Sequence, residues 1–129
     1  MKIYCKDNSY GTGFFCNINI SLNYHLKVLI TNNHILNTND ILFGQTIKLS
    51  INNANKYYNI LIDKNRKKYK DESYDVTIIE IKEEDKIDTE SFFDLDKQIF
   101  YNNANEIFTN CQIYLLHYLD GIRMGFQIE

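Results

Sequence analysis

The stretch KVLITNNHIL, residues 27–36, predicts a buried β-strand that ends at a histidine. The apolar, β-branched run from Val28 to Thr31 is typical of a strand in a protein core. Two asparagines follow, and asparagine favours turns. His34 comes next, and apolar residues then return at once. The pattern therefore indicates that a core strand delivers an imidazole to a turn at its end.

Short apolar stretches separated by polar turns recur along residues 1–81, which is typical of an all-β barrel or sandwich. None of them has the 3.6-residue period of a long helix, and the only helical turn we expect is a short one near residues 34–37. Strands at this spacing predict a small, closed, six-stranded antiparallel barrel. They are expected at residues 2–5, 10–20, 26–31, 45–51, 56–63 and 74–81.

The character of the sequence changes after residue 81. Residues 82–111 are expected to cross the surface, with the Phe92–Phe93 pair docked against it. Residues 112–129 predict a hairpin, since Asp120-Gly121 is a favoured two-residue turn. A hairpin alone is marginally stable. We therefore divide the chain into an N-terminal barrel (1–81), a crossing segment (82–111) and the beginning of a second sheet (112–129).

Composition places the chain among soluble globular proteins. Its 129 residues suffice for one domain, and its 44% hydrophobic content argues against disorder. The formal net charge of −3 gives no reason to expect a nucleic-acid partner, and the basic run RKKYK (66–70) is interpreted as a solvated hairpin loop. No apolar run approaches the roughly 20 residues needed to span a bilayer, and no signal peptide is evident. We expect no membrane partner and a cytoplasmic location.

The three cysteines, Cys5, Cys16 and Cys111, have no C-x-x-C spacing and are odd in number. This pattern favours neither a disulfide framework nor a metal site. We interpret them as buried thiols in a reducing compartment. Nothing in the sequence indicates a cofactor.

Three features carry possible chemistry. Gly11 and Gly13 in GTGFF allow close backbone approach at the head of a strand. His34 ends the buried strand described above, and Asp75 begins the apolar stretch DVTIIEI. A carboxylate that leads a core strand is costly unless it is hydrogen-bonded. A histidine N–H would satisfy it, and that pairing also orients a general base.

In this order, the three motifs resemble those of the trypsin-like (chymotrypsin-fold) serine peptidases, in the branch without disulfides common in bacteria, viruses and protists. GTGFF resembles the family's G-[ST]-G-F strand, LITNNHIL its histidine motif and YDVTIIEI its aspartate motif. The resemblance implies that His34 is the general base, that Asp75 orients it, and that the substrate is a peptide or protein. It also implies that residues 112–129 are the first hairpin of a second barrel. It covers almost all of this chain and little more than half of the family's domain.

The nucleophile motif of that family, G-x-S-G-G, is missing from the chain. No serine follows Ser91, and the late glycines Gly121 and Gly125 cannot form that loop. The oxyanion hole disappears with it, because its backbone N–H donors come from the same loop. Cys111 precedes the hairpin and has no flanking glycine, so it is interpreted as a thiol without a catalytic role. The chain by itself is expected to be inactive.

Three interpretations remain open. The chain is the N-terminal half of a truncated serine endopeptidase domain, whose function is peptide-bond hydrolysis. Alternatively, it is a non-catalytic pseudoprotease, a binding or scaffolding module in which a partner protein or a second copy covers an open face that includes Phe14, Ile35 and Leu115. In the third, it is an unrelated small barrel, and His34 and Asp75 then lie beyond hydrogen-bond reach.

Overall fold

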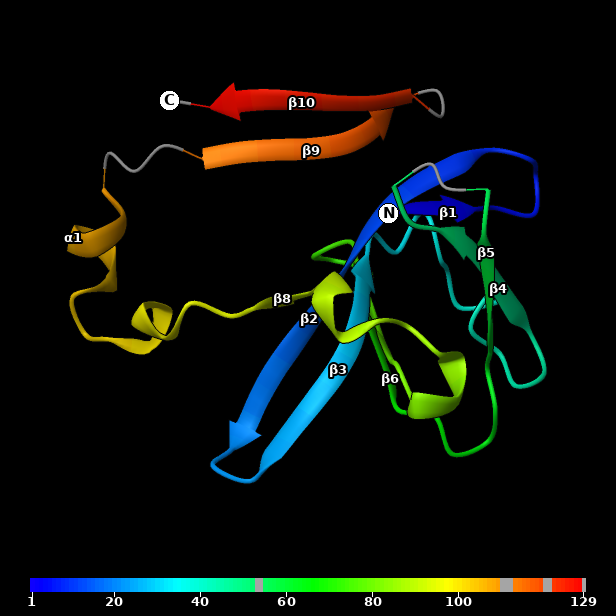
Figure 1. The fold of residues 1–129 in the computed structure, drawn as a ribbon, viewed down its shortest axis with the longest axis horizontal. Helices are drawn as coiled ribbons and strands as arrows, with labels where there is room; N and C mark the ends of the chain where they lie inside the picture. The colour runs from blue at the N-terminus through cyan, green and yellow to red at the C-terminus, as the bar shows by residue number, and fades with distance from the viewer. Residues whose placement is uncertain (53–54, 110–112, 120–121, 129) are drawn as a thin grey trace.

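A computed structural model of the chain describes residues 1–52, 55–109, 113–119 and 122–128, and it is all-β with mostly antiparallel pairing (Figure 1). This confirms the all-β class expected from the short apolar stretches separated by polar turns. The strands are β1 (Lys2–Tyr4), β2 (Tyr10–Ser21), β3 (Tyr24–Thr31), β4 (Thr46–Ser50), β5 (Tyr57–Leu61), β6 (Lys68–Asp71), β7 (Val76–Glu80), β8 (Phe92–Asp94), β9 (Ile113–Leu119) and β10 (Ile122–Ile128). The short helices are η1 (Glu83–Asp85), η2 (Thr89–Ser91), η3 (Lys97–Phe100) and α1 (Ala104–Phe108).

One sheet contains seven strands along the path β5-β4-β1-β2-β3-β7-β6, and β8 joins β2 in parallel. The two strands at the ends of this path, β5 and β6, are consecutive in the chain and are joined by residues 62–67. This linker is hydrogen-bonded on both sides. The N–H of Ile62 donates to the carbonyl of Gln45 at 2.8 Å, and the N–H of Glu80 donates to the carbonyl of Lys67 at 2.9 Å. The chain therefore passes directly from β5, at one end of the sheet path, to β6, at the other end.

The six strands predicted from the sequence correspond to β1–β5 and β7, with ends that differ by at most two residues. The interpretation of residues 66–70 as a solvated loop is wrong. Arg66 is buried, and β6 pairs antiparallel with β7. The side chains of β6 are mostly exposed, so the strand has no apolar alternation to reveal it. A strand at the end of a sheet path pairs through its backbone, and that pairing does not require a buried face.

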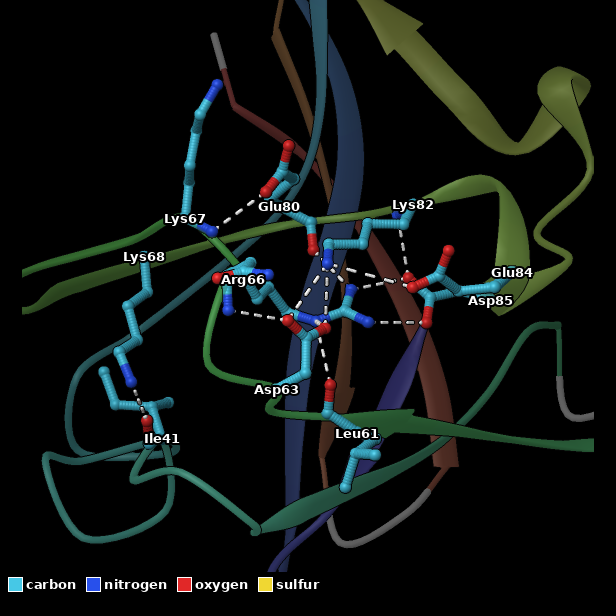
Figure 2. A network of polar contacts seen from close by, with 11 residues as sticks. Ile41, Leu61, Asp63, Arg66, Lys67, Lys68, Glu80, Lys82, Glu84 and Asp85 are labelled. Atoms are coloured by element: carbon cyan, nitrogen blue, oxygen red, sulfur yellow. Dashed lines mark hydrogen bonds and ion pairs between the residues drawn. The ribbon is translucent and has the colours of Figure 1, made fainter.

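Arg66 lies where the 62–67 linker meets the end of β7 and η1, as Figure 2 shows. Its Nη1 and Nη2 donate to the two carboxylate oxygens of Asp85 at 2.6 and 2.9 Å. Its Nε donates to the carbonyl of Leu61 at 2.8 Å, and Nη1 also donates to the carbonyl of Glu80 at 2.8 Å. Because a buried guanidinium without partners is costly, these contacts fix the linker in place.

The core is one cluster of aliphatic and aromatic side chains that the strands direct inward. In β7, buried Thr77 and Ile79 alternate with half-buried neighbours, as expected for a strand with one face on the core. Buried Phe92 places its ring 5.1 Å from that of Phe15 and so attaches the crossing segment to β2. Among the side chains that the structure describes, the fully buried aliphatic ones are Ile3, Val28, Leu29, Leu49, Ile60, Ile62 and Ile79.

The crossing segment and the final hairpin agree in part with the expectations. Only one phenylalanine of the predicted docked pair is buried, since Phe93 is 66% exposed. β9 pairs antiparallel with β10 and lies next to β2. The predicted turn at Asp120-Gly121 lies outside the described residues. The division of the chain at residues 81 and 111 stays a prediction.

Candidate functional site

The candidate histidine lies in a turn that follows β3 directly. The N–H groups of Ile35 and Leu36 donate to the carbonyl of Asn32 at 3.1 and 3.2 Å, which closes the short turn expected there. Leu36 is buried in the core and anchors this turn. The His34 side chain is 65% exposed, so the buried strand presents its imidazole to solvent.

Asp75 lies in the turn before β7, in the left-handed backbone conformation with φ +51°. Aspartate adopts this conformation more readily than most residues other than glycine. β3 and β7 pair antiparallel with Thr31 opposite Thr77. This register places the turn after β3 beside the turn before β7, and it therefore brings His34 to Asp75.

The Asp75 carboxylate accepts two hydrogen bonds from His34. The backbone N–H of His34 donates to Oδ1 at 2.9 Å, and Nδ1 lies 2.6 Å from Oδ2. The backbone N–H first, and then the imidazole, hold the pKa of the Asp75 carboxyl below its usual value. Because the carboxylate accepts, Nδ1 carries the proton of the neutral imidazole and Nε2 keeps a free lone pair. Among the described residues, Nε2 has no hydrogen-bond partner.

Asp75 departs from the sequence-based expectation in its exposure. Its side chain is 43% exposed, so the cost of burying a carboxylate does not explain its pairing with His34. A coincidental pair was expected to lie beyond hydrogen-bond reach. The 2.6 Å separation of Nδ1 and Oδ2 disagrees with that interpretation.

Asn32 and Asn33 were indicated by the sequence only as turn formers, yet both contact Asp75. The Asn32 side-chain amide donates to Oδ2 at 3.2 Å and to the main-chain carbonyl of Asp75 at 3.3 Å. The backbone N–H of Asn33 donates to the same carbonyl at 3.1 Å. Their position directly before the histidine was the only available signal. It did not reveal which of the two reaches Asp75 with its side chain.

The two glycines of GTGFF permit close approach, as expected. A Cβ at Gly11 would lie 2.2 Å from Cγ2 of Ile35, the residue after His34. A Cβ at Gly13 would lie 2.8 Å from Cδ1 of Ile3. Ile35 therefore packs directly on the backbone of β2, and this contact helps to set the position of the histidine turn.

No hydroxyl or thiol of the described residues is hydrogen-bonded to the His34 imidazole. Cys16 is buried, and burial followed by the charge of Asp94 raises the pKa of its thiol. Cys5 is half-buried, so the expectation of a buried thiol is confirmed only for Cys16. Cys111 lies outside the described residues. The described site thus contains a paired imidazole and carboxylate without an adjacent nucleophile.

In the part of the chain that the structure describes, no group of three or more His, Cys, Asp and Glu side chains could hold a metal ion. No helix in those ranges is long and apolar enough to cross a membrane. Comparisons with protein families, curated proteins and solved structures give no match. The chemistry of the site is therefore inferred from the geometry of His34 and Asp75.

Proposed function

We propose that this chain provides the general base and its orienting carboxylate to a trypsin-like serine endopeptidase, which hydrolyses peptide bonds by acyl transfer. The observation that carries the proposal is the contact between His34 Nδ1 and Asp75 Oδ2 at 2.6 Å. This contact favours the neutral tautomer whose Nε2 can accept the proton of a nucleophile. The carboxylate then stabilises the imidazolium that forms.

The strand order supports a six-stranded barrel of the trypsin-like kind. When β5 and β6 are counted as two halves of one strand interrupted at 62–67, the path β5-β4-β1-β2-β3-β7-β6 begins and ends on the same strand. His34 then follows the third strand and Asp75 precedes the sixth, as in the family's motif order. On this proposal, β9 and β10 are the first hairpin of the second barrel.

The nucleophile and the oxyanion donors come, in this proposal, from residues outside the 129 of this sequence. Loss of the nucleophile from such a triad lowers kcat by roughly 10⁶-fold. Loss of even one oxyanion donor costs about 10²–10³-fold more. We therefore expect the chain alone to hydrolyse no peptide substrate, and a peptide or protein substrate to bind only at the completed site.

Sequencing the transcript beyond the codon for Glu129 tests whether a further segment supplies the missing residues. We expect it to encode more strands and a G-x-S-G-G loop. The protein that includes this loop should then react with a fluorophosphonate probe. Changing His34→Ala or Asp75→Asn should abolish the labelling, whereas His25→Ala, at an exposed histidine of β3, should leave it intact. A transcript without such a loop, together with no labelling in the native protein, would overturn the proposal.

A second candidate function is a non-catalytic binding or scaffolding module. It is favoured by two exposed aromatic side chains, Phe14 and Phe93, whose ring centroids lie 6.4 Å apart. Ile35, expected on this face, is half-buried against the core, and the Leu115 side chain lies outside the described ones. Sedimentation of the purified chain tests for a homodimer, which Phe14→Ser with Phe93→Ser should dissociate.

A further inference from the structure

We propose that Asn32 is a positioning residue for the His34–Asp75 pair: its side-chain amide fixes the rotation of the Asp75 carboxylate so that Oδ2 faces the imidazole. The inference rests on the proposed function, because it assigns a role within the same site. Asn32 acts on His34 through the carboxylate of Asp75.

The amide of Asn32 contacts both the side chain and the backbone of Asp75. Nδ2 lies 3.2 Å from Oδ2 and 3.3 Å from the main-chain carbonyl oxygen of the same residue. A donor group that bridges these two oxygens restrains the torsions between them. The same Oδ2 receives the imidazole Nδ1 at 2.6 Å. The restraint by Asn32 therefore acts on the oxygen that orients His34.

Asp75 needs such a restraint because packing does not supply one. Its side chain is 43% exposed, so water competes for both carboxylate oxygens. Among the described residues, only Asn32 and His34 donate hydrogen bonds to its carboxylate. The rotation of the carboxylate thus depends on these two neighbours.

Asn33 provides a matched control of the same residue type at the next position. Its Oδ1 accepts a hydrogen bond from the Thr77 hydroxyl at 3.3 Å, and its side chain makes no hydrogen bond to Asp75. Its contact with Asp75 is made by the backbone N–H, which Asn33→Ala retains. An effect that comes from the Asn32 amide should therefore be absent from Asn33→Ala.

The test measures the tautomer of His34 in the full 129-residue chain by long-range ¹H–¹⁵N correlation, at a pH where the imidazole is neutral. The His34 signals are assigned by their loss in His34→Gln. We expect Asn32→Ala to lower the ratio of the Nδ1–H to the Nε2–H tautomer by roughly two- to tenfold, as loss of one hydrogen bond implies. Asn32→Asp should lower it further, because an ionised carboxylate cannot donate and repels Asp75. Asn33→Ala should keep the wild-type ratio.

The variants separate this inference from the proposed function. If Asp75→Asn leaves the His34 tautomer ratio unchanged, the proposed pairing itself is overturned. If Asp75→Asn lowers the ratio while both Asn32 variants keep it, only the positioning role of Asn32 is overturned. An equal loss in Asn33→Ala also overturns it, because the effect would then belong to the turn. Asn32→Asp preserves the shape of the side chain, so it carries the test even where Asn32→Ala weakens the turn.

Discussion

Arg66 and Asp85 form a bidentate ion pair that is almost closed to solvent, with side chains 1% and 4% exposed. The pair joins the 62–67 linker to η1, two segments that lie outside the strands of the sheet. Asp85 Oδ2 also accepts the N–H of Lys82 at 2.8 Å, and Lys82 Nζ lies 2.9 Å from Asp63 Oδ2 (Figure 2). Within the described residues, every buried side-chain nitrogen and oxygen has a partner. This network holds the turn between β5 and β6 against the end of β7.

Replacement of the arginine should destabilise the fold strongly. We expect Arg66→Met to lower the free energy of unfolding by about 3–5 kcal/mol, because it leaves the Asp85 carboxylate buried without its counter-charge. Urea unfolding followed by circular dichroism measures the change. Lys64→Met, at an exposed position of the same linker, should stay within about 0.5 kcal/mol of wild type. If the double variant Arg66→Met/Asp85→Asn regains part of the lost free energy of unfolding, the unpaired charge is supported as the cause. A loss below about 1 kcal/mol in Arg66→Met alone would contradict it.

A methyl group at position 11 should disturb the histidine turn. Gly11→Ala places a Cβ within 2.8 Å of three Ile35 side-chain atoms, so the turn or the strand has to shift. We expect a loss of about 1–3 kcal/mol in the free energy of unfolding, and a change in the imidazole chemical shifts of His34. Ile35→Ala removes all three atoms. In a double-mutant cycle, Gly11→Ala should therefore cost less in the Ile35→Ala background, and additive losses would exclude this contact as the cause.

Truncation of two leucines in the β2–β3 hairpin region should change the free energy of unfolding by very different amounts. Leu29 in β3 is fully buried, whereas Leu22 in the turn is 98% exposed. Leu29→Ala should lower the free energy of unfolding by about 2–5 kcal/mol, because it removes buried surface and leaves a cavity. Leu22→Ala should change it by less than about 0.5 kcal/mol. Chemical unfolding of both variants gives the comparison, and similar losses would mean that β3 does not face the core as described.

Acid should weaken the fold through its hydrogen-bonded carboxylates. The His34 backbone N–H holds the pKa of Asp75 below its usual value, and the Lys82 hydrogen bond does the same for Asp63. The unfolded chain, with aspartate pKa values near 3.9, then binds more protons than the folded one at low pH. Stability from these groups is therefore fully present above about pH 5 and is lost as the pH falls below about 4.

The variant Asp75→Asn tests how much one such carboxylate contributes to the pH dependence of the free energy of unfolding. Since asparagine does not titrate, the difference in unfolding free energy between wild type and Asp75→Asn should shrink as the pH falls from about 5 to about 3. Urea unfolding at several pH values in that range measures it. Glu90→Gln removes an exposed carboxylate for which no hydrogen bond is found among the described residues, and it serves as the control. A pH-independent difference for Asp75→Asn would show that the carboxyl titrates alike in both states.

The alternating apolar residues were sufficient to predict the strands that face the core. Ile47 and Leu49, or Thr77 and Ile79, carry this information locally, because a buried face requires apolar or hydrogen-bonded side chains at regular spacing. The order of the motifs around His34 and Asp75 was also sufficient to propose that the two meet. β6 was missed because its exposed side chains carry no such spacing.

Local patterns along the chain were sufficient for the all-β class, most strand positions and the candidate pair of His34 and Asp75. The burial of Arg66, the half-exposure of Asp75 and the reach of Asn32 to its carboxylate became apparent only in the folded chain. These contacts join residues far apart in the chain, and their polar side chains are compatible with either a solvated loop or a paired site. Charge and hydrogen-bonding capacity are local properties, whereas the partner that satisfies them is set by how the strands pair.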